Sequence, residues 1–156
     1  MRIALGADHA GYQLKDDIKQ HLEQQGISVR DEGTSSAESV DYPDYALAVA
    51  HDVSEKRVDL GILVCGSGIG MAISANKVNG IRAANVSTEY EAQVSREHNN
   101  ANVLTLGARI ICPEEAFRIV DMWLATQFAG GRHERRVEKI MAIEKEEDAA
   151  GASKGH

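Results

Sequence analysis

The chain has 156 residues, and its 17 Lys and Arg against 24 Asp and Glu give a formal net charge of −7 at pH 7. A chain of this length is sufficient for one domain with a full core, which buries about 70% of the surface of the unfolded chain. The acidic balance argues against binding to nucleic acid or to an anionic membrane surface, because both require clustered positive charge.

Short apolar runs rich in Val, Ile and Leu alternate along the chain with longer segments of helical period. The first run predicts a strand over Ile3–Leu5. Apolar residues four positions apart then predict a helix over Tyr12–Gln25, which Gly26 ends because glycine readily adopts the left-handed conformation that closes a helix. Further strands are expected at Ile27–Arg30, Leu60–Val64, Ile81–Val86 and Val103–Leu106.

Helices are expected between these strands. Asp41-Tyr42-Pro43 opens the second helix, a short third helix contains Met71, and a fourth covers Thr88–Glu97. Pro113 begins a fifth helix, because proline is favoured at the first helical position and acidic residues follow it. The alternation predicts an α/β protein with a three-layer αβα, Rossmann-like fold, a five-stranded parallel sheet with right-handed crossovers, and an extra C-terminal helix.

The C-terminal helix carries a largely apolar stripe at three- and four-residue spacing, which can pack on this subunit or on a partner. The stripe consists of Val137, Ile140, Met141 and Glu144. We expect one domain over residues 1–148. Residues 149–156 are small and polar with no apolar period, and they are expected to form a flexible tail.

Two cysteines, Cys65 and Cys112, are expected to be free thiols, because nothing marks the chain as secreted and disulfides are rare in the reducing cytosol. The N-terminus has no apolar signal segment, and no apolar run approaches the roughly 20 residues of a membrane span. We therefore expect a soluble, cytoplasmic protein that binds neither nucleic acid nor membranes.

The apolar run Leu60–Val64 ends in Cys65 and then breaks into the glycine-rich segment Gly66–Gly70. A thiol between a strand and a helix is exposed at the rim of the sheet, and backbone N–H dipoles there favour its thiolate. A cysteine after a strand is more often an inert core residue, and the glycine loop is what favours a catalytic Cys65. Cys112 has no such loop and is expected to be structural.

Polar residues lie next to three predicted strands. Ligands of parallel α/β sheets bind outside the carboxyl ends of the strands, so we expect Asp8-His9, Cys65–Gly70 and His98-Asn99-Asn100 to share one rim. Asp8 has the alternative role of capping the next helix. Arg132 and Arg136 share a helical face, where they suit a phosphate or ion pairs with nearby Glu residues. No role is assigned to the isolated histidines His21, His51, His133 and His156.

Eight short segments of the chain match, in order, the motifs of one known family. They are Asp8-His9-Ala10-Gly11, Asp41-Tyr42-Pro43, Cys65-Gly66-Ser67-Gly68-Ile69-Gly70, Asn76-Lys77, Gly80-Ile81-Arg82-Ala83, His98-Asn99, Asn102-Val103-Leu104 and Gly130-Gly131-Arg132-His133. From Met1 to about Glu147 the chain resembles the B-type ribose-5-phosphate isomerases. It is also similar to the related allose-6-phosphate and galactose-6-phosphate isomerase subunits, so the resemblance identifies the family more firmly than the substrate.

The resemblance implies an aldose-ketose isomerase of the pentose phosphate pathway, which interconverts D-ribose 5-phosphate and D-ribulose 5-phosphate through an enediol without a metal or other cofactor. It assigns proton transfer between C1 and C2 to Cys65 and ring opening to His98. Ser67 adds a hydroxyl to the loop N–H groups that receive the charge on the carbonyl oxygen. Serine here is a departure, because many family members carry threonine at this position.

The resemblance also implies how the substrate is held. Asp8 would hold sugar hydroxyls and Asn99 would place substrate oxygens, while the backbone donors belong to Gly66, Gly68, Ile69 and Gly70. The phosphate contacts would be His9, Arg109, Arg132 and Arg136. Sites of this family lie at a dimer interface and draw residues from both subunits, which implies a homodimer or a dimer of dimers.

A nucleotide-binding or sensor module is the alternative from another functional class, because a glycine loop between strand and helix holds the pyrophosphate in dinucleotide folds. Glu89 lies about 20 residues further on, where a ribose-binding acid is sought. The spacing argues against this function, since Gly66-x-Gly68-x-Gly70 is not G-x-G-x-x-G and follows the third strand, not the first. Isomerases of six-carbon sugar phosphates are the alternative within the enzyme class.

Overall fold

A five-stranded sheet forms the centre of the computed structural model, which describes residues 1–154. The strands are β1 (Arg2–Ala7), β2 (Ser28–Asp31), β3 (Leu60–Cys65), β4 (Ala83–Asn85) and β5 (Val103–Gly107), in the spatial order β2-β1-β3-β5-β4. All neighbouring strands pair in parallel, which confirms the predicted parallel sheet. Because β2 lies on one side of β1 and β3 on the other, the order of the strands reverses between β1 and β3.

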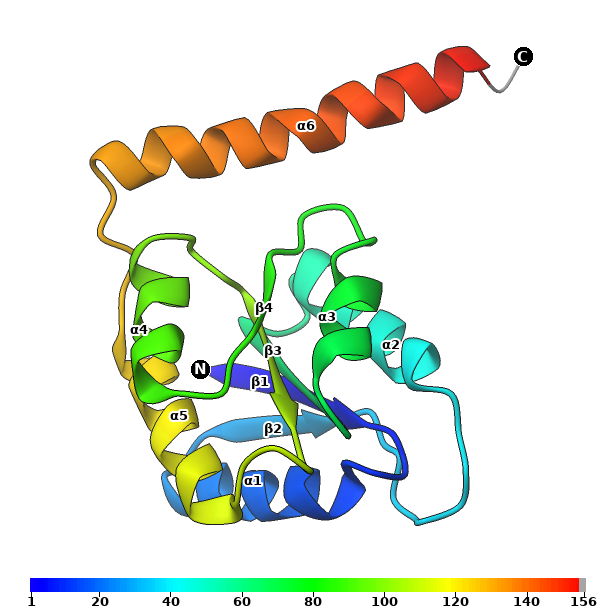
Figure 1. Cartoon of the computed structure of the whole chain (residues 1–156), viewed down its shortest axis with the longest axis vertical. Helices are drawn as coiled ribbons and strands as arrows, with labels where there is room; N and C mark the ends of the chain where they lie inside the picture. The colour runs from blue at the N-terminus through cyan, green and yellow to red at the C-terminus, as the bar shows by residue number, and fades with distance from the viewer. Residues whose placement is uncertain (155–156) are drawn as a thin grey trace.

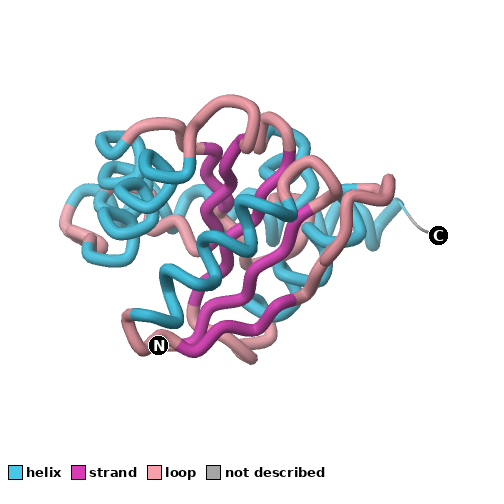
Figure 2. Tube along the Cα trace, turned by 90° about the horizontal axis from the view of Figure 1, so that it is seen from below, coloured by secondary structure: helices cyan, strands magenta, loops and turns pink. Residues whose placement is uncertain are grey.

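Helices cover both faces of the sheet (Figure 1). On one face lie α1 (Tyr12–Gln24), α4 (Glu89–Glu97) and α5 (Pro113–Ala125), and on the other lie α2 (Tyr42–Ser54) and α3 (Ile69–Ala75). Figure 2 shows α1 lying across the strands. The predicted three-layer αβα architecture is therefore confirmed.

Side chains that alternate along the strands divide the core into two layers. On the α1 side, Ile62 and Val64 of β3 pack in one cluster with Trp123 of α5. On the α2 side, Leu63 and Cys65 belong to a second cluster with Val49. Full burial of one large apolar side chain contributes about 1.5–3 kcal/mol. Burial of β3 on both faces fixes the position of Cys65 at its end.

The last helix, α6 (Arg132–Lys154), lies outside the three layers and crosses above them in the view of Figure 1. Within its predicted stripe Val137 is buried, whereas Ile140 is 44% exposed, so the stripe packs on its own subunit only in part. The helix covers residues 149–154 of the predicted tail, and Gly155 and His156 lie outside the described residues. No helix found in residues 1–154 has the length and apolar character needed to cross a membrane.

Candidate active site

A cavity of about 520 Å³ opens at the carboxyl ends of the neighbouring strands β1 and β3, where the strand order reverses. In open α/β sheets this reversal is where ligands bind. The lining residues are Asp8, Tyr42, Cys65, Gly66, Ser67, Ile69, Gly70, Ile73, Arg109 and Ile110. Most of these are predicted site residues, so the fold brings together one large part of the predicted site.

Cys65 is the last residue of β3 and is only 5% exposed. Its Sγ accepts a hydrogen bond from the Gly68 N–H at 3.2 Å, across the turn between β3 and α3. A backbone N–H in this position stabilises negative charge on sulfur. Gly68 has a φ of +81°, and a Cβ there would lie 2.3 Å from Asn85 Oδ1. The turn that brings this donor to the thiol therefore requires glycine at position 68.

The segment that follows β5 supports the cysteine loop, which is the stretch Cys65–Gly70 between β3 and α3. Ala108 N donates to Cys65 O at 2.8 Å, and Arg109 N donates to Gly66 O at 3.0 Å. These bonds continue the contact between β3 and β5 beyond the strand ends. The guanidinium of Arg109 consequently lies beside Gly66, where a Cβ would be 3.0 Å from Nη1. An exposed cation thus stands at the edge of the cavity.

Asp8 and His9 follow β1 and are both held by the backbone. Asp8 Oδ1 accepts hydrogen bonds from Ala10 N at 3.0 Å and Gly11 N at 3.1 Å, so the side chain orders the turn before α1 while it also lines the cavity. Both bonds use Oδ1, and Oδ2 takes no part in them. His9 Nδ1 accepts from Val40 N at 3.2 Å. A neutral His9 therefore carries its proton on Nε2, as a donor for an anion.

Three lining residues, Tyr42, Ile73 and Ile110, were not assigned to the site from the sequence. The Tyr42 ring packs so closely on Gly70 that a Cβ there would lie 2.6 Å from it. Two of the three could have been assigned to the site from the sequence. Tyr42 belongs to the family motif Asp41-Tyr42-Pro43, and Ile73 follows Ile69 by one helical turn. Ile110 could not, because its position depends on how the chain leaves β5.

His98, Arg132 and Arg136 belong to a second cluster, at the end of α4 and the start of α6. The ring of His98 stacks on that of His133, with the centroids 4.3 Å apart and the planes 10° from parallel. Partial burial lowers the pKa of His133, and the charges of His98, Arg132 and Arg136 lower it further. Two imidazoles and two guanidiniums thus lie close together, which suits an anionic ligand.

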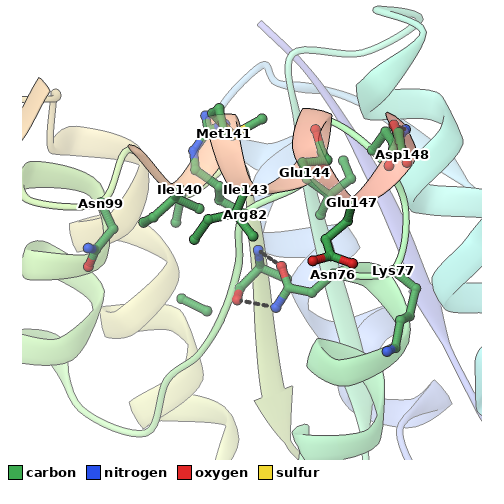
Figure 3. Close-up of a pocket in the computed structure, with 15 residues that line it drawn as sticks. Asn76, Lys77, Arg82, Asn99, Ile140, Met141, Ile143, Glu144, Glu147 and Asp148 are labelled. Atoms are coloured by element: carbon green, nitrogen blue, oxygen red, sulfur yellow. Dashed lines mark hydrogen bonds between the residues drawn. The ribbon is translucent and has the colours of Figure 1, made fainter. Parts of the chain in front are cut away.

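Asn99 lies in a separate groove of about 730 Å³ between α6 and the segment from the end of α3 to β4 (Figure 3). Three contacts hold α6 there, one of which is the hydrogen bond that Asn79 Nδ2 donates to Asp148 Oδ2 at 2.6 Å. Gly80 N donates to the Glu144 carboxylate at 2.9 Å and 3.1 Å, and Arg82 Nη1 lies 3.2 Å from Met141 Sδ. The groove and the Cys65 cavity are therefore different surfaces of the chain.

Comparison with known proteins identifies the family. Residues 3–140 match the family described as Ribose/Galactose Isomerase. The chain belongs to the ribose/galactose isomerase family. Ribose-5-phosphate isomerase B of Escherichia coli (strain K12) is 52% identical over 143 residues, which cover 92% of this chain and 96% of that protein. The resemblance inferred from the motifs is thus confirmed.

Solved structures of the ribose/galactose isomerase family share the fold. Ribose-5-phosphate isomerase B of Clostridium thermocellum matches with a TM-score of 0.93 and 51% identity, over 94% of this chain and 99% of that one. The enzyme of Mycoplasma genitalium, solved with bound ribulose-5-phosphate, matches with a TM-score of 0.89 and 44% identity, over 93% of this chain and 97% of that one. The predicted α/β fold is therefore that of the family.

Within one chain of this family member, the predicted site residues do not all meet. His98 and Asn99 precede β5, whereas Cys65 ends β3, and the strands run in parallel. The start of a parallel strand lies at the edge of the sheet opposite to the strand ends. The prediction that His98-Asn99-Asn100 share a rim with Cys65 is therefore wrong for a single chain. Arg132 and Arg136 lie with His98, away from the thiol.

His133 is expected to titrate below the ordinary histidine value of 6.5, because partial burial and the nearby cations disfavour its charged form. Replacing Arg132 with Gln removes one of these charges and should raise the pKa of His133. Proton NMR of the imidazole Cε1–H over pH 4–9 measures both values. Arg135→Gln is the matched control, since the Arg135 charge is not among those that act on His133. An equal shift in both variants would contradict the cluster geometry.

Proposed function

We propose that this chain is a ribose-5-phosphate isomerase, which interconverts D-ribose 5-phosphate and D-ribulose 5-phosphate through an enediol. The main support for this proposal is the Cys65 thiol. It accepts a hydrogen bond from a backbone N–H at the end of β3 and lines a cavity of about 520 Å³. The name of the Escherichia coli relative and the ribulose-5-phosphate bound in the Mycoplasma genitalium structure support this substrate.

Cys65 is the proposed base. In the open-chain aldose, its thiolate takes the proton from C2, the C1–C2 double bond forms, and the charge that develops on O1 gives an enediolate. A proton passes from O2 to O1, and the sulfur returns its own proton to C1 to give the 2-ketose. Four residues of this loop, Gly66, Ser67, Ile69 and Gly70, line the same cavity. The N–H groups of Gly66–Gly70 and the hydroxyl of Ser67 are proposed to receive the developing charge.

Ring opening and substrate binding are assigned to the other residues. Ribose 5-phosphate is mainly a closed furanose, so a proton must first move between the C1 hydroxyl and the ring oxygen, and His98 is the proposed group for this transfer. Asp8 and Asn99 would hold the sugar hydroxyls. The proposed phosphate ligands are all donors, because a dianion is best held by charged or N–H groups. They are His9, Arg109, Arg132 and Arg136.

A second copy of the chain is proposed to complete the site, in a homodimer. Cys65 and His98 are at opposite edges of one sheet, so both can reach one substrate only if His98 comes from the partner. Exposed isoleucines support this assembly, since Ile69 and Ile73 are 55% and 59% exposed beside the thiol and Ile143 on α6 is 60% exposed. Apolar surface of this kind marks protein interfaces. The cytoplasm is the proposed location, because its reducing conditions preserve a catalytic thiol.

Ketose formation from ribose 5-phosphate, measured in the presence of a chelator, tests the proposed function. Allose 6-phosphate and galactose 6-phosphate are run in parallel, and turnover of the pentose phosphate is expected to be fastest. Faster turnover of a hexose phosphate would reassign the substrate within the family. No turnover of any of the three, together with a raised melting temperature in a nicotinamide dinucleotide, would favour the nucleotide-binding alternative.

A further inference from the structure

Thr105 is a buried polar residue in the middle of β5, close to the cysteine loop but outside the cavity lining. Its side chain has 0% exposure, among strand residues that are otherwise apolar. The hydroxyl donates to Gly68 O at 2.9 Å, across 37 positions of sequence. A buried hydroxyl without a partner is costly, and this bond satisfies it.

The carbonyl of Gly68 is consequently held from two directions. Ala72 N donates to it at 3.1 Å as the first hydrogen bond of α3, and Thr105 ties it to the sheet. Asn85 Oδ1 also lies 3.1 Å from the Thr105 hydroxyl. A hydroxyl has only one proton to donate, so the shorter contact, to Gly68 O, is assigned as the hydrogen bond.

The orientation of this carbonyl determines where the loop donors point. A peptide group is planar and trans, so the Ile69 N–H points opposite to the Gly68 C=O. With the carbonyl turned toward β5, the Ile69 N–H faces Ser67 Oγ at 3.2 Å, on the cavity side. The N–H of Gly68 itself is the donor to Cys65 Sγ. One residue thus links the Thr105 bond to both donors.

The glycine-rich loop Gly66–Gly70 needs an external hydrogen bond to fix its conformation, because its own sequence allows many backbone conformations. Glycine at positions 66, 68 and 70 leaves the backbone with little intrinsic restriction. The sheet supplies the restriction instead, since a Cβ at Gly107 would lie 2.7 Å from the Ser67 backbone. The packing of Gly107 on Ser67 limits how close the loop comes to β5. Of these two contacts with the sheet, only the hydrogen bond from the Thr105 hydroxyl fixes the rotation of the Gly68–Ile69 peptide group.

We propose that Thr105 is a positioning residue for isomerisation, which orients the Gly68–Ile69 peptide group and through it the donors around the thiol and the reacting oxygen. This inference rests on the proposed function for its kinetic part only. Thr105 is fully buried and does not line the cavity, so its loss should affect proton transfer more than substrate binding. Loss of one hydrogen bond of this kind corresponds to a decrease in kcat of about threefold to tenfold.

Thr105→Val tests the proposal, because valine keeps the shape of the side chain and removes the hydroxyl, and Thr105→Ser restores the hydroxyl. We expect kcat for ribose 5-phosphate to fall about threefold to tenfold in the valine variant, with KM within about twofold, and to recover in the serine variant. The primary isotope effect with substrate deuterated at C2 should rise, because proton abstraction becomes slower relative to the other steps. Reduced folding alone would leave KM and the isotope effect unchanged.

Thr126→Val is the matched control, since its hydroxyl also donates to a backbone carbonyl, Met122 O at 2.7 Å, at the far end of α5. It should leave kcat and the isotope effect unchanged. Amide hydrogen exchange at Gly68 and Ile69 provides a readout that does not depend on activity, and it should be faster in Thr105→Val than in the wild type or the control. Unchanged exchange at both amides would show that the Thr105 hydroxyl does not hold the Gly68–Ile69 peptide group. Faster exchange with a wild-type kcat and isotope effect would show that this peptide group is held but that its position does not affect the reaction.

Discussion

Replacing Cys65 with Ala is expected to lower kcat for isomerisation of ribose 5-phosphate by about 10³-fold, the contribution typical of a positioned base. The alanine variant lacks the proposed group that carries a proton between C1 and C2, while the Gly66–Gly70 backbone is retained. Steady-state kinetics of ketose formation measure the loss. Because binding is retained, ribose 5-phosphate should still raise the melting temperature of the variant.

Cys112 provides the matched control for this substitution. It is the other free cysteine of the chain, exposed at the start of α5 and absent from the cavity lining. Cys112→Ala should therefore keep wild-type kcat and KM, and thiol alkylation that inactivates the wild type should inactivate this variant equally. If Cys65→Ala keeps more than about a tenth of the wild-type kcat, the thiol is not the base.

The sheet and the cysteine loop could be predicted from the sequence because local patterns determine them. Runs such as Leu60–Val64 are buried on both faces in a parallel sheet, so they are apolar throughout, and the predicted strand matches β3 within one residue. Gly26 has a φ of +79°, the conformation expected where a helix ends. Glycines at 66, 68 and 70 likewise indicated the turn that places a backbone donor on Cys65.

The relation between the two halves of the site could not be predicted in this way. His98 and Cys65 both lie next to strands, but one precedes its strand and the other ends one, and in a parallel sheet this places them at opposite edges. The role of Thr105 could not be predicted from the sequence either. The β-branched shape of threonine is enough to explain its place in a strand, so nothing in the sequence indicates a further contact. Its contact with Gly68 depends on strand order, which places β5 next to β3.

The separation of Cys65 and His98 leads to a prediction about mixed dimers. His98→Asn should lower kcat about 10²-fold, since the ring-opening group is lost, and Cys65→Ala is nearly inactive. When the two variants are refolded together in equal amounts, half of the dimers should contain one chain of each kind. If each site takes Cys65 from one chain and His98 from the other, such a dimer has one site with both defects and one intact site.

Activity in the mixture should therefore recover to about a quarter of the wild-type value, far above that of either variant alone. Mixing Cys65→Ala with Cys65→Ala that also carries His98→Asn is the control, because no combination of these chains restores an intact site. Absence of recovery, with subunit exchange verified by mass spectrometry of the intact dimers, would mean that each site uses residues of a single chain. In that case Cys65 and His98 of one chain would act on one substrate although the parallel strands hold them at opposite edges of the sheet, and the proposed dimer site would be wrong. A wild-type kcat in His98→Asn alone would instead show that His98 has no part in the reaction.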